Sequence, residues 1–486
     1  MRLHWHRRDL RVADNRALAA AAGDGETVLP VFVLDPAVLA NAGPPRAAFL
    51  LDALRSLRAD YRGLGGDLLV TRGDPREELP RIADEYGADA VYWNRDYSGL
   101  ARERDGEVRL ALDDAGVSRA AYHDELLHEP GSVRTNQGEH YSVFSYFWRK
   151  WRDRETDAPV DPPAEGEVVD AGRIAGTDVP ALADLGVDKP EAEIPAAGTA
   201  AARERLRAFC GDDVFRYAAD RDYPAREGTS RLSVHLKWGT VGIREVWRAT
   251  EEAMARADGD PDEDASDGDG GEAEEPGEAA SVREFQRQLA WREFYAHVLA
   301  ARPDVVSRNY REYESEVEWR EDEAALRAWK DGETGYPIVD AGMRQLRAEA
   351  WMHNRLRMVV ASFLTKDLLI DWREGYAWFR EKLADHDPAN DAGGWQWAAS
   401  TGTDAQPYFR VFNPTTQGER YDPDAEFVRE HVPELRDASA EQIHGWHELD
   451  PAERERIAPD YPAPIVDHAE RREAAIAMFE RARGEE

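Results

Sequence analysis

Aromatic rings, guanidinium groups and carboxylates gather in four segments, and these side chains could bind and position a large ligand. The segments are HWHRRDLRVADNRAL at residues 4–18, Tyr217 with TSRLS at 229–233, QLAWREFY at 288–295, and residues 335–423, which contain WMHNRLRM and WQWAASTGTD. TSRLS offers hydroxyls and backbone N–H groups in a short polar stretch that could begin a helix, and such a site suits phosphate. An ordinary helix cap beside a core tyrosine would give the same pattern.

QLAWREFY has aromatic residues at helical spacing. Trp291 and Phe294 are three residues apart and would share one face of a helix. This indicates either a buried aromatic stripe or a stacking surface, which contributes about 1–3 kcal/mol for each base it holds.

Metal chemistry is weakly indicated. Asp385, His386 and Asp387 form one short cluster without further ligands, which is poor evidence for a metal site. The chain has a single cysteine, Cys210, and no zinc-type Cys/His spacing. We therefore expect no metal and no disulfide within the chain.

The N-terminal quarter alternates strand and helix signals. Strands are predicted at residues 3–6, 28–34, 68–71, 90–93 and 120–123, with Ala- and Leu-rich periodic stretches between them. Alternating strands and helices predict an α/β domain over residues 1–128, a parallel sheet with helices on both faces. No GxGxxG follows the first strand, so a dinucleotide site is not indicated there.

The remaining chain divides into a connector and a helical part. Residues 129–195 are rich in Pro, Gly, Asp and Ala, with one predicted helix in the aromatic stretch 141–151. Residues 196–486 predict a larger all-α domain. Within it, residues 258–280 are nearly all Asp, Glu, Gly, Ala and Pro, too polar to pack, and we expect a disordered acidic loop.

Composition and charge narrow the cellular environment in which we expect the protein to work. The 486 residues carry 62 basic and 97 acidic side chains, a formal charge of −35. No apolar run reaches 18 residues and the start has no apolar signal region, so we expect a soluble cytoplasmic protein without a membrane span. The excess of acidic over basic residues, and of Arg over Lys, suggests a protein adapted to a cytoplasm of high salt. At roughly 1 M salt the Debye length is about 3 Å, so the net charge has little effect on binding and local contacts decide it. A generic acidic enzyme fits the charge equally well.

The order and spacing of the four segments resemble the photolyase/cryptochrome family along nearly the whole chain. Residues 335–423 are most similar to bacterial-type class I cyclobutane pyrimidine dimer photolyases. The resemblance implies an α/β domain, a connector and a helical domain that holds FAD in a U shape, in a monomer. It also implies DNA as partner, a flipped-out pyrimidine dimer as substrate, and light-driven electron transfer from reduced FAD that splits the dimer, a carbon–carbon lyase reaction.

The resemblance also assigns the cofactor site. Arg292 would lie against the flavin, Arg357 would pair with Asp385 beside its ring system, and TSRLS would hold the pyrophosphate. The full FAD-binding set that it implies is Tyr217, Thr229, Ser230, Arg231, Leu232, Ser233, Gln288, Arg292, Tyr295, Arg357, Asp385, Asp387 and Asp391.

The lesion pocket and the electron route follow from the same resemblance. Trp291 and Trp397 would form opposite walls of the pocket, and Met358 would close it. The implied DNA-binding set is Arg221, Gln288, Trp291, Asn354, Arg355, Met358 and Trp397. Catalytic roles fall to the electron-transfer tryptophans and two residues near the flavin and lesion: Trp319, Trp372, Trp395, Gln288 and Asp391. Without the resemblance, core packing would be the favoured interpretation of each tryptophan.

A second, light-harvesting pigment is also expected. Family members that bind 8-hydroxy-5-deazaflavin use an Arg, an Asp and a Lys that match Arg8, Asp96 and Lys237. The family's folate contacts fall near Val306 and Ser307, which do not match, so methenyltetrahydrofolate or an empty pocket is the less favoured alternative. Ordinary surface polarity would also account for the three residues.

Two positions depart from the family pattern. Many class I photolyases have Glu at the position of Gln288, and Gln can donate a hydrogen bond but cannot supply a proton. Photolyases usually have Asn where this chain has Asp391, and plant cryptochromes have Asp. A cryptochrome-like blue-light photoreceptor and a (6-4) photoproduct photolyase are therefore the alternative functions.

Overall fold

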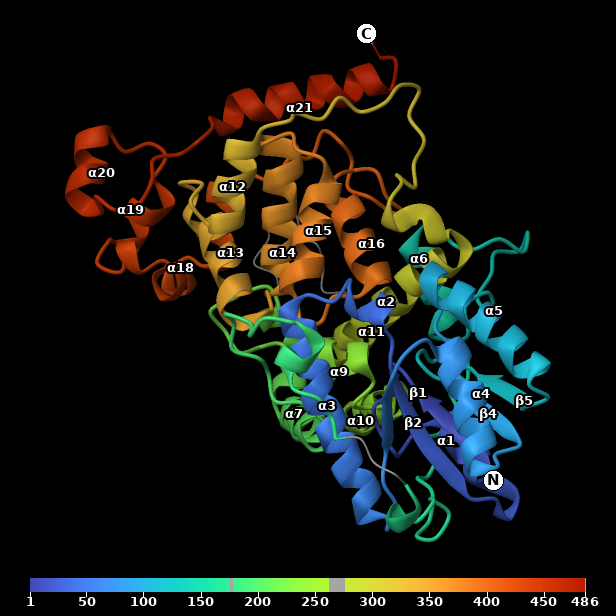
Figure 1. Ribbon diagram of the computed structural model, residues 1–486. Helices are drawn as coiled ribbons and strands as arrows, with labels where there is room; N and C mark the ends of the chain where they lie inside the picture. Colours follow the sequence, from blue (N-terminus) through green and yellow to red (C-terminus); the bar gives the residue numbers. More distant parts are fainter. Residues whose placement is uncertain (175–177, 262–275, 486) are drawn as a thin grey trace.

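The N-terminal part is a five-stranded parallel sheet with helices on both faces, as predicted (Figure 1). The computed structural model describes residues 1–174, 178–261 and 276–485. The strand order is β3-β2-β1-β4-β5. All five predicted strands are present within two residues of their expected bounds: β1 Arg2–His6, β2 Val28–Leu34, β3 Leu69–Arg72, β4 Ala90–Asn94 and β5 Ser118–Tyr122.

Alternating side chains of the strands bury both faces of the sheet. Along β2, Val28, Phe32 and Leu34 pack against α1 and α3, whereas Leu29 and Val31 pack against α4 and α5. A strand that is apolar on both sides is what a doubly covered parallel sheet requires. The helices of this part are α1 Arg16–Ala22, α2 Pro36–Leu39, α3 Pro44–Gly63, α4 Pro75–Tyr86 and α5 Gly99–Asp114.

The connector leaves the sheet and later returns to it. Its aromatic stretch forms α6 (Phe144–Trp151), confirming the predicted helix. Val168 and Val169 are buried beside β2, and Val28 bridges to Val168. Part of the connector is therefore packed against the start of β2 and does not simply run over the surface. The domain boundaries at residues 128 and 195 stay predictions.

The rest of the described chain is helical, as predicted (Figure 1). Its helices are α7 Thr199–Gly211, α8 Tyr217–Asp220, α9 Ser233–Trp238, α10 Ile243–Met254, α11 Glu278–Ala301, α12 Glu323–Asp331, α13 Pro337–Glu349, α14 Asn354–Ser362, α15 Trp372–Lys382, α16 Pro388–Ala398, α17 Pro414–Tyr421, α18 Glu426–His431, α19 Ala440–His444, α20 Pro451–Ile457 and α21 His468–Ala482. Short 3₁₀ turns occupy Gly23–Gly25, Ala171–Arg173, Leu182–Leu185, Asp213–Phe215, Pro303–Val306 and Pro433–Leu435, and a π-helical turn spans Phe363–Asp367.

Two apolar clusters fill the helical part. One is built mainly by α6, α7, α10 and α11, the other mainly by α12 to α16 with α18. Helices α11 and α16 pack against each other where the clusters meet. Most of the acidic segment predicted as a loop, residues 262–275, lies outside the described residues, and its last residues are helical because α11 begins at Glu278.

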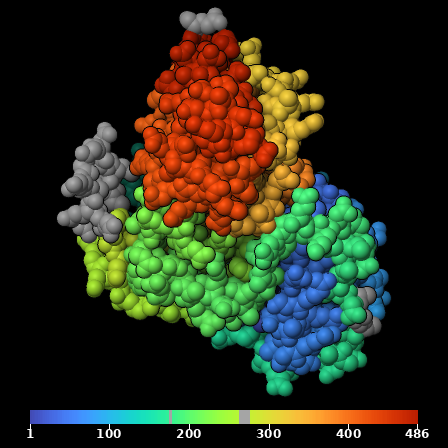
Figure 2. Space-filling view, turned by 90° about the vertical axis from the view of Figure 1, so that its left-hand side faces the viewer, coloured from blue at the N-terminus to red at the C-terminus, as the bar shows by residue number. Residues whose placement is uncertain are grey.

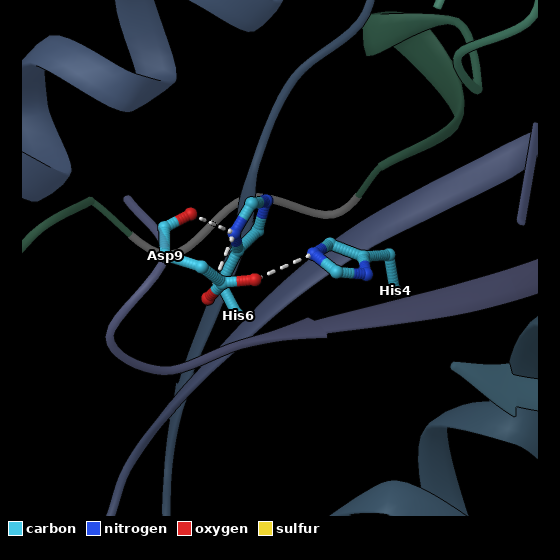
Figure 3. A group of neighbouring side chains, drawn as sticks. All are labelled: His4, His6 and Asp9. Carbon is cyan, nitrogen blue, oxygen red and sulfur yellow. Dashed lines mark hydrogen bonds and ion pairs between the residues drawn. The ribbon is translucent and has the colours of Figure 1, made fainter. Parts of the chain in front are cut away.

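A polar group at the carboxyl end of β1 fixes the loop that follows (Figure 3). His4 Nε2 lies 3.3 Å from a carboxylate oxygen of Asp9, and His6 Nδ1 lies 3.0 Å from the Asp9 carbonyl. The other ring nitrogen of His6 bonds to Tyr61, and Asp9 accepts from Asn94 at 2.6 Å. Burial lowers the pKa of His4 to about 4, so this ring is neutral at pH 7. The atoms are of metal-ligating kinds, and here they bond to one another and to their neighbours.

Buried ion pairs join the helical part to the α/β part. Arg244 on α10 donates to Asp14 at 2.6 Å and to Asp124 at 2.5 Å, and all three side chains are about 1% exposed. Arg11 also donates to Asp124. Among the described residues, no helix is both long and apolar enough to cross a bilayer.

Replacing Arg244 should destabilise the protein strongly. Arg244→Met leaves two buried carboxylates without this partner, and we expect a loss of about 3–5 kcal/mol in the free energy of unfolding. Chemical denaturation would measure it. Arg248→Met, on an exposed position of the same helix, should change stability by less than about 0.5 kcal/mol. Equal stability of the two variants would contradict the role given to Arg244.

Candidate functional site

A cavity of about 270 Å³ opens between the segment that carries α8 and α9 and helices α11, α14 and α16. Figure 2 shows the face on which the green segment, which includes α7 to α9, meets the orange and red C-terminal part. Twelve of the thirteen residues predicted to bind a cofactor line this cavity. They are Tyr217, Thr229, Ser230, Arg231, Leu232, Ser233, Gln288, Arg292, Arg357, Asp385, Asp387 and Asp391.

 The remaining member of the set, Tyr295, packs against Gly393 on α16 and does not line the cavity.

One wall of the cavity is a cluster of buried charges. Arg357 on α14 donates to Asp385 at 2.7 Å, as predicted from the resemblance, and lies 3.7 Å from Asp391. Asp391 in turn bonds to His386 at 2.5 Å. Burial opposes the charge on Arg357, but the carboxylates of Asp385 and Asp391 outweigh it and raise the pKa of the guanidinium. The guanidinium of Arg357 therefore keeps its positive charge in this wall.

The carboxylate of Asp385 has an oxygen that no protein group satisfies. Oδ1 is buried and has no hydrogen-bond partner, whereas Oδ2 accepts from Arg357. A buried polar atom without a partner is costly unless a ligand or water supplies one. Because Asp385 lines the cavity, this oxygen is suited to accept a hydrogen bond from a ligand with N–H or O–H groups, such as a flavin with its ribityl chain.

Hydroxyl and guanidinium groups form another part of the cavity wall. Thr229, Ser230 and Ser233 line it, and α9 begins at Ser233, the last residue of TSRLS. Arg231 lies between them, pairs with Glu349 at 2.8 Å and stacks over Trp351 at 4.2 Å. The arrangement offers several donors for phosphate oxygens.

A much smaller second cavity shares Arg292, Asp387 and Asn390 with the first, and its charges are tightly paired. Arg8 and Asp96 both line it and lie 3.6 Å apart. Arg8 also reaches Glu125 at 2.8 Å and Asp387 at 2.7 Å. Lys237 lines the larger cavity instead, and burial together with the charge of Arg8 lowers the pKa of Lys237 to about 8. The three residues predicted to hold an antenna pigment therefore lie near one another but on different cavities.

Two basic side chains of the predicted DNA-binding set are paired with acids. Arg221 and Gln288 line the cavity, and both donate to Glu284. Arg355 pairs with Asp222 at 2.8 Å. A phosphate that approaches Arg221 or Arg355 must therefore compete with a carboxylate already in place.

The remaining residues of the predicted DNA set lie on the surrounding helices. Asn354 lines the cavity and contacts Met358 at 3.7 Å on α14. Trp291 stacks on Phe144 with ring centres 3.7 Å apart, and Trp397 lies against Phe412. Trp291, Arg355, Met358 and Trp397 do not line the cavity. Only some residues of the predicted DNA-binding set thus line the cavity.

The three predicted electron-transfer tryptophans belong to one apolar cluster. Trp372 and Trp395 are buried in it, and Trp319 is half-buried at its edge. The Trp395 ring lies on the backbone of Gly375, one helical turn after Trp372 on α15. The structure therefore brings Trp395 beside the turn that carries Trp372 and leaves Trp319 nearest to solvent.

Sequence reasoning missed several lining residues. Phe285 and Leu289 are one turn before and one residue after Gln288 on α11, and Leu236 is one turn after Ser233. Helical periodicity around the predicted residues would have found them. Trp351 and Met352 precede α14 and gave no such signal.

Comparison with known proteins agrees with this geometry. The family model for DNA photolyase matches residues 2–165, and the model for the FAD binding domain of DNA photolyase matches residues 285–481. A deoxyribodipyrimidine photo-lyase of Halobacterium salinarum is 59% identical over the full length of both chains. The crystal structure of a bacterial class III photolyase from Agrobacterium tumefaciens is 36% identical, with a TM-score of 0.88 over 99% of this chain and 98% of that chain. That of an archaeal photolyase from Sulfolobus tokodaii, which holds two FAD molecules, is 31% identical, with a TM-score of 0.81 over 99% of both chains.

The contact of Trp395 with Gly375 makes a testable prediction. A Cβ at Gly375 would lie 2.0 Å from the indole ring, so Gly375→Ala must displace Trp395 and should cost about 1–3 kcal/mol of stability. Gly394→Ala, on the neighbouring helix α16, meets nothing within 4 Å and should be neutral or slightly stabilising, because alanine favours helices. Chemical denaturation of both variants measures the difference. A Gly375→Ala protein as stable as Gly394→Ala would refute the close contact.

Proposed function

The chain belongs to the DNA photolyase family, and from that premise we propose that it repairs cyclobutane pyrimidine dimers in DNA with the energy of blue or near-UV light. The observation that carries the proposal is the large cavity, which is lined by nearly all of the predicted cofactor residues and by Gln288, Asn354 and Arg221. The Halobacterium salinarum relative, which is matched over its full length, is a deoxyribodipyrimidine photo-lyase. We place the chain in class I because of the set Trp291, Asn354, Arg355, Met358 and Trp397.

FAD is the cofactor of the family domain that matches residues 285–481. Bound in the reduced form, it supplies light-driven electron donation, chemistry that no amino-acid side chain provides. Asp385 would accept a hydrogen bond from the flavin through its unpaired oxygen, and Arg357 holds that carboxylate in place. Thr229, Ser230 and Ser233 would bind the pyrophosphate. Asp391, held by His386, would lie close to the ring system.

The lesion would enter from the side of Gln288 and Asn354. A dimer must leave the base stack to reach the cavity, and a pyrimidine pair that stacks poorly is less costly to extrude than two intact bases. Gln288 and Asn354 would bond to its polar edges, and Trp291 and Trp397 would give it stacking surfaces. Arg221 and Arg355 would bind the neighbouring phosphates in exchange for Glu284 and Asp222.

The tryptophans would restore the reduced cofactor. Indole rings are readily oxidised, and Trp395, Trp372 and Trp319 belong to one cluster that reaches from the interior to a half-exposed ring. An electron would enter at Trp319 and leave Trp395 toward the cavity. Asn309 accepts a hydrogen bond from Trp372 at 2.9 Å and fixes the orientation of the middle ring.

The antenna pigment stays a prediction. We favour 8-hydroxy-5-deazaflavin bound near Arg8, Asp96 and Lys237, with methenyltetrahydrofolate as the alternative. The relative from Sulfolobus tokodaii holds two FAD molecules, so the second site varies within the family. In this chain a pigment must displace or share the carboxylates that surround Arg8. A monomeric state and a cytoplasmic location are likewise proposed, the latter because the substrate is chromosomal DNA.

The function itself is tested by illumination. Purified protein with reduced FAD, mixed with DNA that contains a thymine dimer and kept in high salt, should restore intact thymines under blue light and not in the dark. A parallel reaction on (6-4) photoproduct DNA distinguishes the alternative lesion. Dimer content that stays unchanged under light would reject repair and would favour a photoreceptor role.

The electron route predicts the behaviour of Trp372→Phe. This variant should lose photoreduction of oxidised FAD, because phenylalanine is far harder to oxidise than indole, yet repair by chemically pre-reduced protein should persist. Trp446→Phe removes another buried indole from the same cluster and should leave photoreduction unchanged. Absorption spectra recorded during illumination measure both. Normal photoreduction in Trp372→Phe would eliminate the route.

A further inference from the structure

Glu284 bonds to two residues that line the large cavity, Gln288 and Arg221. On α11 it is one helical turn before Gln288, whose Nε2 donates to Glu284 Oε1 at 2.7 Å. Arg221 Nη1 donates to the same oxygen, and Arg287 lies 3.6 Å from the other carboxylate oxygen. The Glu284 side chain is 25% exposed, and Glu284 itself does not line the cavity.

This contact fixes the orientation of an unsymmetrical group. A glutamine amide has a carbonyl on one side and an NH₂ on the other, and half a turn about its last bond exchanges them. An ionised carboxylate accepts hydrogen bonds and donates none. Glu284 therefore selects the orientation in which the NH₂ of Gln288 faces it, because the exchanged orientation would set carbonyl oxygen against carboxylate and lose a charge-assisted bond.

The orientation decides which pyrimidine edge Gln288 fits. Thymine presents an N3–H donor beside the O4 acceptor, whereas cytosine presents an N3 acceptor beside an N4 amino donor. The cyclobutane ring forms at C5 and C6, so these edges survive in the dimer. An amide with a fixed carbonyl and one remaining N–H complements the thymine edge, and it would have to turn over to complement cytosine.

We propose that Glu284 is a positioning residue that makes the lesion pocket prefer thymine over cytosine. The inference rests on the proposed function, in which Gln288 contacts the dimer. Arg221, the second partner of Glu284, would contact phosphate, which carries no sequence information. When a Glu284 variant frees Arg221, the affinity for every DNA changes by the same factor. This factor cancels when the affinities for two lesions are divided by each other.

The test compares two lesions in the dark. FAD-loaded full-length protein is titrated with otherwise identical oligonucleotides that carry a thymine–thymine or a thymine–cytosine dimer. We expect the unaltered protein to bind the thymine–thymine dimer about tenfold more tightly, as one well-formed bidentate contact implies. Glu284→Met should bring the ratio close to one while it raises the affinity for both DNAs at low salt. Glu284→Gln keeps an acceptor oxygen and should retain part of the preference.

Matched controls separate this role from general effects. Glu252→Met removes one carboxylate from the exposed face of α10 and should leave the ratio unchanged. The content of bound FAD verifies that each variant is folded. If Glu284→Met does not fold, Glu284→Gln replaces it in the comparison of the two lesions. An equal ratio in the unaltered protein and the variant, or no preference in the unaltered protein, overturns the inference. Failure of the unaltered protein to repair the thymine dimer under light would instead reject the proposed function.

Discussion

Charge buried without a partner is the constraint on which the rest of this structure depends. The large cavity is walled by Arg357, Asp385, Asp387 and Asp391, and each is held by an opposite charge or a hydrogen-bond donor. Burying a charge is costly unless an opposite charge or a hydrogen-bond partner lies against it, and this pairing offsets that cost. The one buried oxygen of this wall that remains without a partner, Oδ1, belongs to Asp385, which lines the cavity where a ligand is expected.

The same constraint joins the two halves of the molecule. Arg244 satisfies Asp14 and Asp124 of the α/β part from a helix of the other part, and Arg8 links the loop after β1 to Asp387 at the start of α16. Because Asp387 also lines the large cavity, the position of that cavity wall depends on the sheet. The α/β part thus supports the cofactor site although none of its strands contributes a residue to the cavity wall.

A net charge of −35 remains compatible with DNA as substrate where salt screens long-range repulsion. Carboxylates lie directly against the arginines expected to bind DNA, as Glu284 does against Arg221 and Asp222 against Arg355. These acids lower the general attraction for DNA. In high salt, where long-range attraction is screened in any case, recognition then depends on contacts with the lesion itself.

The sequence by itself determined the five strands and their parallel arrangement, because apolar runs alternating with periodic helices admit few other folds. It also determined the residue types of the cofactor wall, since the spacing of TSRLS, QLAWREFY and the segment around Asp385 matches a known family. Only the tertiary structure decided that Arg221 shares the Glu284 carboxylate with Gln288, that Arg8 is enclosed by three carboxylates, and that Lys237 lies on a different cavity from Asp96. These arrangements bring together residues that are far apart in the sequence, and no local pattern in the chain predicts which of them meet. Local periodicity specifies which face a side chain takes, whereas its partner across that face is fixed only when the helices pack.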